Sequence, residues 1–403
     1  MTPRANRPPR LLLLLPRSAY RAGPFLSTAR DLDYEVIVGS NHRTSLPGGQ
    51  MLELPLGSPG QCVQRIAELN TRRRLDAVFG VDEATSTVAA AACRQLGLPG
   101  NPPQAVAILH DKLRFRCWLS ARGLRAPRFM SVRTTGFAPP ATGYPWVVKP
   151  RSLSASRGVV RVDHPDAFAD AVTDLSAQMS GVPEPRALAE SYIPGVEVTL
   201  EGLLIEGTLH TLALFDKPDT PAGPAFPETL YVTPSRLPQQ WQAACHNEVQ
   251  SLTQQLHLTT GPIHAELRVN ADGCWLIEVA ARPIGGLCAS LLRFGNDETH
   301  ESLLLRQAVG ERELNTAREP LAAGVLMLPV EQTGHLRTVE GLEAAARVPG
   351  IENVHITLAR GQAVAPLPWG DPYLGFVFAK ASTPSEVEHA LRTAKRKIRP
   401  VII

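Results

Sequence analysis

The sequence predicts an α/β fold for about its first 105 residues and an α+β fold for the rest. Strand and helix patterns alternate from residue 10 to about residue 105, which is typical of a parallel sheet with helices on both faces. From Pro127 onward short β segments dominate, and the stretches 196–216 and 264–280 each have the pattern of a β-hairpin. A chain of 403 residues is long enough for several such units.

The N-terminal unit is predicted from apolar strands and amphipathic helices in turn. In chain order we expect a strand at Leu11–Leu15, a helix at Pro24–Asp31, a strand at Tyr34–Gly39, a helix at Gln61–Arg74, a strand at Asp76–Val81 and a helix at Ala84–Leu96. No G-x-G-x-x-G motif follows the first strand, so a dinucleotide site is not supported. Asp82 and Glu83 lie where open α/β sheets place ligands, although a helix N-terminus explains these acids equally well.

The later elements follow the same kind of pattern. Residues 106–126 are expected to form one helix that ends at Gly123. The expected β segments are Arg128–Val132, Trp146–Lys149, Val159–Val162 and Ala187–Glu190, with a helix at 165–179 among them. After the 196–216 hairpin, which turns at Glu206–Gly207, we expect helices at 239–258, 296–310 and 384–398.

Composition and charge narrow the class of protein. A hydrophobic content of 44% with 20% charged residues is ordinary for a globular chain, and a net charge of +3 is too small to argue for a nucleic-acid partner. The six cysteines are scattered without a C-x-x-C pair, which argues against a zinc site and a disulfide framework and fits a reducing cytoplasm. The Leu run that ends at Pro16 is too short for a signal peptide, and no stretch approaches the length of a membrane span.

The 264–280 hairpin carries a pair of carboxylates. If Ala271-Asp272-Gly273 forms the turn, Glu266 lies directly opposite Glu278, with Cβ atoms roughly 5 Å apart. Like charges repel at that distance, and oxygen-only ligation suits Mg²⁺ held by one or two carboxylates and substrate phosphates. The face expected to be polar carries His264, Glu266, Arg268 and Glu278, and the face expected to be core carries Ala265, Leu267, Val269, Trp275, Ile277 and Val279. The alternative is a solvated face on which Arg268 neutralises one glutamate.

Two further segments have the chemistry of a nucleotide site. Lys149 ends an apolar strand and is followed by the small-residue loop Arg151–Gly158, whose backbone N–H groups could cradle phosphate oxygens. In residues 189–197, an apolar-aromatic pair follows Glu190 and Glu197 opens the next hairpin, a combination that suits adenine and ribose. The alternatives are an ordinary hairpin loop and an ordinary strand–turn–strand.

Taken in order, these motifs resemble the ATP-grasp superfamily and, within it, carboxylate–amine ligases of the L-amino acid ligase type. The ordered set is a lysine in the linker helix, V-V-K-P, a loop ending S-R-G, E-x-Y-I-x-G-x-E, and H-x-E-x₁₁-E-x₃-R-x₂-G-G, and the resemblance runs from about residue 10 to the C-terminus. It implies a pre-ATP-grasp Rossmann-like domain at 1–105, a linker helix with a small ATP-grasp lobe at 106–190, a large ATP-grasp lobe with the metal site at 191–315 and a C-terminal α+β subdomain at 316–403.

The resemblance also implies a role for each matching residue. The nucleotide contacts would be Lys112 and Lys149 on the α- and β-phosphates, Ser154, Ser156, Arg157 and Gly158 in the closing loop, Glu190 with the Tyr192–Ile193 backbone on adenine, and Glu197 on ribose. Mg²⁺, with Mn²⁺ as an alternative ion, would bind Glu266 and Glu278. Arg282 would bind the substrate carboxylate and its acyl phosphate, aided by the backbone of Gly285 and Gly286, and Lys217 would reach the γ-phosphate.

Two positions depart from the pattern of relatives. Ala280 stands where many have an asparagine that would be a third metal ligand, and Ser152 begins the phosphate loop where many have glycine. His264 is a candidate to receive the proton of an amine, and the alternative is a structural hydrogen bond. Glu228 is a candidate to contact a positively charged amine, and the alternative is a solvated loop glutamate. The substrate pocket should be lined by the C-terminal unit and the 217–236 loop.

The resemblance therefore implies an ATP-dependent ligase that joins a small-molecule carboxylate to an amine through an acyl phosphate, releasing ADP and phosphate. An ATP-grasp carboxylase that activates bicarbonate and a non-catalytic nucleotide-binding protein are the alternatives. A homodimer is common among such ligases and is left open, and neither substrate is named by any motif in the sequence.

Overall fold

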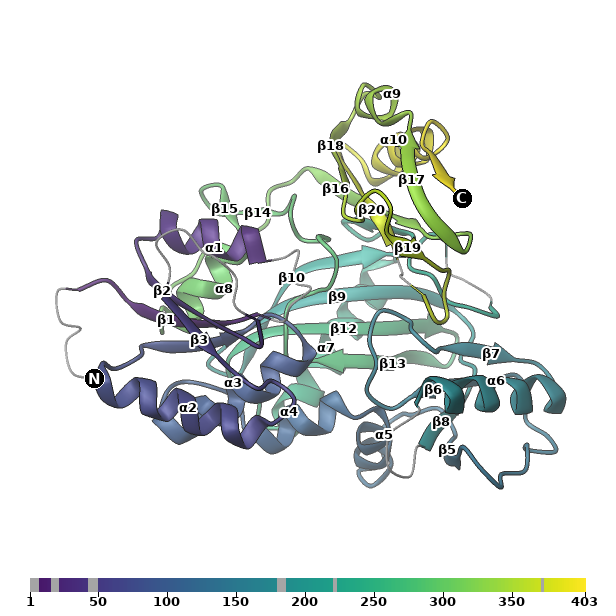
Figure 1. Ribbon diagram of the computed structural model, residues 1–403, viewed down its shortest axis with the longest axis horizontal. Helices are drawn as coiled ribbons and strands as arrows, with labels where there is room; N and C mark the ends of the chain where they lie inside the picture. Colours follow the sequence, from purple (N-terminus) through teal and green to yellow (C-terminus); the bar gives the residue numbers. More distant parts are fainter. Residues whose placement is uncertain (1–6, 16–21, 43–49, 180–185, 220–222, 371–372) are drawn as a thin grey trace.

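The computed structural model describes residues 7–15, 22–42, 50–179, 186–219, 223–370 and 373–403. It places a parallel α/β unit at one side, a small antiparallel sheet at the other, a large sheet between them and a C-terminal extension beside that sheet (Figure 1). The α/β and α+β fold class is confirmed. Pro16 and residues 220–222 of the predicted substrate-lining loop lie outside the described residues.

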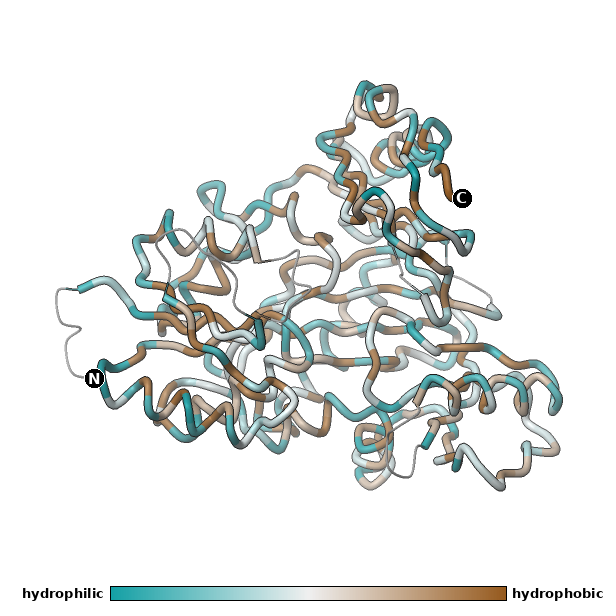
Figure 2. Tube along the Cα trace, in the orientation of Figure 1, coloured by the Kyte–Doolittle hydropathy of each residue, from teal (hydrophilic) through white to brown (hydrophobic). Residues whose placement is uncertain are grey.

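The N-terminal sheet is parallel, with the strand order β3-β2-β1-β4. Its strands are β1 (Arg10–Leu14), β2 (Glu35–Ser40), β3 (Gln50–Glu53) and β4 (Ala77–Gly80), and its helices are α1 (Ala22–Asp31), α2 (Pro59–Arg72) and α3 (Glu83–Leu96). Leu11 and Leu13 pack with α1 on one face of β1, and Leu12 and Leu14 pack with α2 and α3 on the other. In Figure 2 the tube is brown along β1 and alternates between teal and brown along α2, as expected of a buried strand and a half-buried helix. Strand β3 is not predicted, because it is a short edge strand whose ends are exposed.

The single helix predicted over 106–126 is wrong. The chain forms α4 (Pro103–His110) and α5 (Lys112–Ser120), with Asp111 in an extended conformation between them. The Asp111 carboxylate accepts hydrogen bonds from the backbone N–H groups of Leu113 and Arg114 and so caps α5. Aspartate competes with the helix backbone for these donors, which favours a new helix start over a continuous helix.

The small sheet is antiparallel, with the strand order β5-β8-β6-β7. Its strands are β5 (Phe129–Arg133), β6 (Trp146–Pro150), β7 (Val160–Val162) and β8 (Arg186–Ser191), and its helix is α6 (Pro165–Gln178). Phe168, Val172 and Leu175 of α6 are fully buried against Val148 and Ala189 of the sheet. One face of this sheet is therefore covered by a helix, and Lys149 and Glu190 are left to line the pocket described below.

The large sheet has eight strands in the order β13-β12-β9-β10-β11-β16-β20-β18. These are β9 (Val196–Ile205), β10 (Thr208–Asp216), β11 (Leu230–Thr233), β12 (Gly261–Asn270), β13 (Gly273–Ala280), β16 (Ala322–Pro329), β18 (Ile351–Ile356) and β20 (Tyr373–Ala381). Helix α7 (Gln239–Gln255) covers one face, where Val249 and Leu252 pack with Leu200, Ala265 and Leu267. The other face of β9 and β12 carries the polar side chains of the candidate site.

The remaining elements extend the C-terminal half. Helix α8 (His300–Ala308) follows a short ribbon of β14 (Arg293–Phe294) and β15 (Glu298–Thr299), so the predicted helix at 296–310 begins later than expected, at the cap Thr299. Helix α10 (Pro384–Lys395) packs Val387 and Leu391 on β16 and β20. The other elements are β17 (Gly334–Glu340), α9 (Leu342–Ala346), β19 (Ala363–Val364) and β21 (Arg399–Ile402).

The large sheet runs through the predicted domain boundary at residue 316, since β16, β18 and β20 continue the sheet that β9 to β13 begin. The division into four units therefore stays a proposal. Within the described part of the chain, we find no helix with the length and apolarity that crossing a bilayer requires.

Candidate active site

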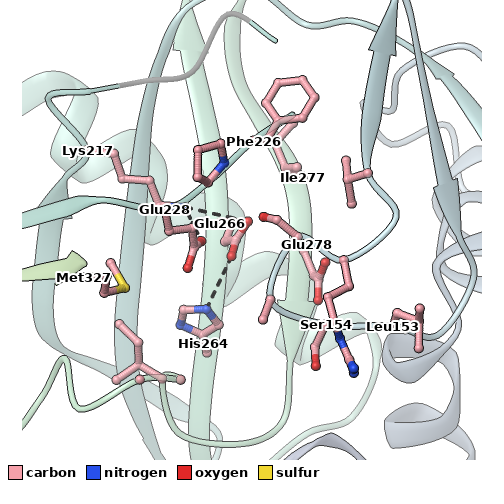
Figure 3. A pocket seen from close by; sticks show the side chains of 18 of the residues that line it. Leu153, Ser154, Lys217, Phe226, Glu228, His264, Glu266, Ile277, Glu278 and Met327 are labelled. Atoms are coloured by element: carbon pink, nitrogen blue, oxygen red, sulfur yellow. Dashed lines mark hydrogen bonds and ion pairs between the residues drawn. The ribbon is translucent and has the colours of Figure 1, made fainter. Parts of the chain in front are cut away.

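A pocket of about 850 Å³ opens between the small sheet, the polar face of the large sheet and the end of β4. Of the residues predicted for the site, all line this pocket except Gly158. Figure 3 shows the labelled side chains of Glu266 and Glu278 near its middle, with Lys217 and Glu228 on one side and Ser154 on the other. We call the part around Lys112, Lys149 and residues 151–158 the loop end, and the part around residues 282–286 the turn end.

The hairpin β12–β13 carries the two carboxylates as predicted, because Glu266 is the direct partner of Glu278 in the ladder. The assignment of Trp275 and Ile277 to the core face is wrong. A β-bulge next to Glu266 shifts the register, so that Leu276 pairs with Leu267 in the core and Ile277 lines the pocket. A bulge re-aims the side chains on one strand, and here it places an apolar residue beside Glu278.

The carboxylates of this pair have different partners. Lys112 Nζ lies 3.0 Å from Glu278, and although burial opposes ionisation, the Lys112 charge and hydrogen bond hold the pKa of Glu278 at about 2. Lys217 Nζ is farther from Glu266, at 3.8 Å. Burial, followed by the nearby charges of Glu228 and Glu278, raises the pKa of Glu266 even though Lys217 opposes the shift.

The carboxylate pair fits a divalent cation. Glu266 is half-buried beside the charges of Glu228 and Glu278, which is an electrostatic condition that a bound cation relieves. Among the described residues no group of three or more His, Cys, Asp or Glu side chains is placed to hold a metal ion. The predicted third position is the buried Ala280, which offers no side-chain ligand. Phosphate oxygens and water would have to complete the shell, as is usual for Mg²⁺.

The loop end holds its cations in ion pairs. Lys149 Nζ lies 2.6 Å from Glu190, whose other oxygen lies 2.7 Å from Arg116 Nε. Burial lowers the pKa of Lys149, and it opposes the ionisation of Glu190, yet Arg116 and Lys149 together lower the pKa of that carboxyl. Glu190 was predicted to contact adenine, but its side chain is engaged by Arg116 and Lys149. Arg116 was not predicted as a site residue, because a helix arginine gives no motif.

The phosphate loop is shaped by left-handed backbone. Ala155, Ser156 and Gly158 all have positive φ, of 58°, 55° and 70°. Successive N–H groups in such a segment form a concave surface for anions. Ser154, Ser156 and Arg157 line the pocket, whereas the Gly158 N–H donates to Pro368 O at 2.7 Å. A Cβ on Gly158 would lie 2.8 Å from the Trp369 ring, so this glycine of the predicted closing loop contacts the C-terminal segment.

Aromatic and apolar side chains flank the segment predicted to hold the base. The Tyr192 ring lies between the guanidinium groups of Arg161 and Arg268, at 4.5 and 4.8 Å. Ile193, Phe226 and Ile277 line the same part of the pocket. Arg268 pairs with neither Glu266 nor Glu278. Its guanidinium lies 2.7 Å from the Glu197 carboxylate and donates a hydrogen bond to Ile193 O.

Lys217 lies among three carboxylates. Its Nζ is 2.8 Å from Glu197, 2.9 Å from Glu228 and 3.8 Å from Glu266. Burial opposes the charge, but these neighbours raise the Lys217 pKa well above its usual value. Burial opposes the ionisation of Glu228, but the Lys217 charge and hydrogen bonds lower its pKa to about 2. Glu228 is therefore a pocket residue and not a solvated loop glutamate.

At the turn end, Arg282 Nε lies 2.7 Å from the Glu83 carboxylate. Both acids at the end of β4 line the pocket, but they have different partners: Asp82 accepts the Thr85 N–H and caps α3, whereas Glu83 pairs with Arg282. Gly285 has no atom within 4 Å of where a Cβ would stand, and Gly286 has φ of 61°. The backbone here is accessible, as a substrate-contacting turn requires.

Behind the turn end lies a group that the sequence did not reveal. Glu201 is fully buried on β9 and contacts His300 and the backbone N–H of Ile284. His264 lies 3.5 Å from Glu201 and 3.7 Å from Glu266. Glu201 follows Glu197 at an interval of four on the same strand, so the two share a face, and this spacing is the signal that could have found it.

Two family models match the chain: an ATP-grasp domain at residues 142–291 and an L-amino acid ligase C-terminal domain 2 at residues 326–402. Uncharacterized protein y4rH of Sinorhizobium fredii is 25% identical over 76% of this chain and 64% of that protein. Alanine–anticapsin ligase of Bacillus amyloliquefaciens is 24% identical over 56% of this chain and 52% of that protein. The chain thus spans less than two thirds of the length of these curated relatives.

A solved structure supports the fold along the whole chain. The crystal structure of L-amino acid ligase from Bacillus licheniformis matches with a TM-score of 0.81 at 24% identity, covering 99% of this chain and 100% of that one. The match spans the N-terminal α/β unit and the small sheet as well as the segments that the family models cover. Residues 142–291 therefore match an ATP-grasp domain, residues 326–402 match the C-terminal domain 2 of L-amino acid ligases, and the chain has the fold of the solved L-amino acid ligase.

Proposed function

We propose that this protein is an ATP-dependent ligase that joins a carboxylic acid to an amine through an acyl phosphate, with ADP and phosphate as products. The observation that carries the proposal is the gathering, around one pocket, of two buried lysines, an opposed pair of glutamates and an arginine beside an open glycine turn. Phosphoryl transfer depends mainly on positioning and charge neutralisation, and these groups supply both.

The proposed chemistry has two steps. An oxygen of the acid attacks the γ-phosphorus of ATP, and the bond to the ADP oxygen breaks. The amine nitrogen then attacks the acyl carbon, inorganic phosphate leaves, and the nitrogen loses a proton. Both steps bring anions together in a buried site, so the protein must offset their repulsion.

Each group of the chain has a part in these steps. Lys112 and Lys149 would bind phosphate oxygens of the nucleotide, and Lys217 would approach the γ-phosphate. Arg282 would orient the acid, because its planar guanidinium can bind both carboxylate oxygens. Glu266 and Glu278 would hold Mg²⁺, which supplies further neutralisation of the phosphates. His264, in the same pocket face, is the candidate to accept the amine proton.

A screen for ADP release tests this proposal and finds the substrates. Wild-type protein with MgATP is supplied with amino acids singly and in pairs, and ADP is measured by a coupled assay. We expect certain pairs to release ADP faster than either member alone, with one amide formed for each ADP. Bicarbonate as a co-substrate tests for a carboxylase. If no acid changes the basal rate of ADP release, the ligase proposal is wrong.

A matched pair of variants tests the metal assignment. Glu278→Gln removes a half-buried carboxylate paired with one lysine, and Glu319→Gln removes a similar one, paired with Lys380 at 2.6 Å, outside the pocket. We expect kcat/KM to fall ~100-fold or more in the first variant, because several kcal/mol of charge stabilisation are lost. The control should retain wild-type activity. Equal activity of Glu278→Gln and wild type would rule out the assignment.

A further inference from the structure

Glu201 is a buried carboxylate that lies outside the pocket. Its side chain has no exposed surface, and it is absent from the residues that line the cavity. It stands on β9 opposite His264 of β12 and Ala213 of β10. A carboxylate in such a position needs strong partners, since burying an unpaired charge is costly.

The partners of Glu201 come from the turn end and from α8. The backbone N–H of Ile284 donates to both carboxylate oxygens, at 3.1 and 3.0 Å. His300 Nε2 lies 2.9 Å from Oε1, and His264 Nδ1 lies 3.5 Å from Oε2. One buried group therefore joins a central strand of the sheet, the Arg282–Gly286 turn and the first residue of α8.

The Ile284 contact falls at the middle of the turn. Arg282 precedes it by two residues and Gly286 follows by two, so fixing the Ile284 amide restrains both sides of the segment. His300 is itself buried and begins a helix whose leucines pack in the core shared with the N-terminal sheet. The anchor is thus tied to the rigid part of the molecule and not to another loop.

The charge of Glu201 is stabilised in place. Burial opposes ionisation, but the hydrogen bonds and charges of His264 and His300 lower the pKa of this carboxyl to about 2. An ionised carboxylate accepts shorter and stronger hydrogen bonds than an amide does. A Gln side chain at this position would have about the same size, yet it would have only one acceptor oxygen for Ile284 and His300.

We infer that Glu201 is a positioning residue for the acid-substrate end of the pocket, where it holds the Arg282–Gly286 turn from behind in the geometry that binds the acid. The expected effect on kinetics rests on the proposed function. The anchoring of the turn rests on the structure alone. Glu201 touches no substrate in this account. Its effect passes through the Ile284 backbone to Arg282 and the glycine amides.

The first test measures the anchoring without any turnover. Hydrogen–deuterium exchange is compared between wild type, Glu201→Gln and a control, Asp76→Asn. Asp76 is also a carboxylate that accepts a backbone N–H, from Arg10 at 2.7 Å, but it lies in the N-terminal unit. We expect faster exchange in the peptide containing residues 282–286 only in Glu201→Gln. Unchanged exchange of that peptide would overturn the inference, whatever the activity of the protein.

The second test is kinetic and uses the amino acid with the highest ADP release in the wild-type screen. In Glu201→Gln we expect its KM to rise ~10-fold or more, because small displacements of a positioning group have large effects. The affinity for MgADP should stay within about 2-fold of wild type, and more ADP should form per amide bond as the acyl phosphate is less well held. An equal loss of amino-acid and MgADP binding would indicate general destabilisation and refute the positioning role.

A second residue keeps the inference testable if Glu201→Gln does not fold. His300→Leu removes one donor to Glu201, and His300→Gln retains one. We expect His300→Leu to accelerate exchange of the 282–286 peptide and His300→Gln to restore it towards wild type. No difference between the two variants would contradict the inference. A wild-type protein that releases no ADP with any amino acid would refute the proposed function, while the exchange result would still decide the anchoring.

Discussion

The two ends of the pocket hold their charged groups in different ways. At the loop end, cations and carboxylates inside the pocket pair with each other, as Lys149 does with Glu190 and Lys112 with Glu278. At the turn end, Arg282 also pairs with Glu83 inside the pocket, and in addition the turn itself is anchored by Glu201 from outside the cavity. The loop end is therefore held by ion pairs between side chains, whereas the turn end also has a backbone segment that a buried carboxylate fixes.

This difference fits the two kinds of ligand that we propose. A triphosphate with its metal brings both negative and positive charge, so it can replace the Lys112–Glu278 pair with two new pairs of the same type. A single carboxylate brings one charge and needs a receptor that is already shaped for it, because preorganised groups lose little free energy on binding.

Arg116 is the test of how strongly the loop end depends on its internal pairs. It is 1% exposed, holds Glu190 and donates to Leu276 O and Ile277 O. Replacing it with Met leaves a buried carboxylate with one partner, so we expect unfolding to become easier by about 3–5 kcal/mol. Arg114→Met, on the same helix with a side chain 64% exposed, should change the free energy of unfolding by less than about 0.5 kcal/mol. Similar denaturation midpoints for both would contradict this account.

Glu201 is expected to make the stability of the protein depend on pH. Its pKa is lowered from 4.5 to about 2 by His264 and His300 against burial, so its stabilising effect is present above pH 4.5 and is lost as the pH falls towards 2. A shift of this size corresponds to about 3 kcal/mol. We expect the stability of Glu201→Gln to fall less than that of wild type between pH 5 and pH 2, while Glu206→Gln, an exposed change on the adjoining turn, follows wild type. Parallel profiles for all three proteins would be inconsistent with an ionised Glu201.

The Lys149→Met variant measures how much Lys149 contributes to the binding free energy of the nucleotide at the loop end. Loss of a charge-assisted hydrogen bond of about 1.5–3 kcal/mol corresponds to ATP binding ~10- to 100-fold weaker. Lys380→Met, which removes a paired lysine outside the pocket, serves as the control in a calorimetric titration with MgADP. If Lys149→Met binds MgADP as tightly as wild type, Lys149 does not contact the phosphates.

Glu83→Gln is expected to have the smallest effect. The amide keeps an acceptor for Arg282 but removes the charge, so the KM for the acid should change by only ~2- to 5-fold. Asp82→Asn is the control, since asparagine caps a helix about as well as aspartate and Asp82 already bonds Thr85. A change in MgADP affinity instead of the KM for the acid would assign Glu83 to the loop end.

Much of the fold could be predicted because its patterns are local. The Leu run of β1, the 196–216 hairpin and the Glu266–Glu278 pairing each depend on neighbours close in sequence. Predictions failed where one residue interrupted a regular helix or strand pattern. Asp111 ended a helix by capping the next one, and the bulge beside Glu266 exchanged the faces of Leu276 and Ile277.

Most of the site was predictable from ordered motifs, and Glu83 was indicated by its place at the end of a parallel strand, but its pairing with Arg282 was not. Arg116, Glu83 and His300 come from separate helices or helix starts and meet the motif residues only after folding. Their charges are needed because the motif residues are buried, and the sequence alone shows neither that burial nor its compensation. Gly158 had the expected spacing but faces Trp369, a contact that depends on the distant C-terminal segment.

If the acid is activated by transfer of the γ-phosphate, an oxygen atom of its carboxyl group must leave with the inorganic phosphate. The amino acid that is active in the screen is prepared with ¹⁸O in its carboxyl group and incubated with ATP, Mg²⁺ and its amine partner. Mass spectrometry then follows the label in the products. We predict that one ¹⁸O appears in the inorganic phosphate for each amide formed. Label in AMP, or phosphate without label, would contradict the account.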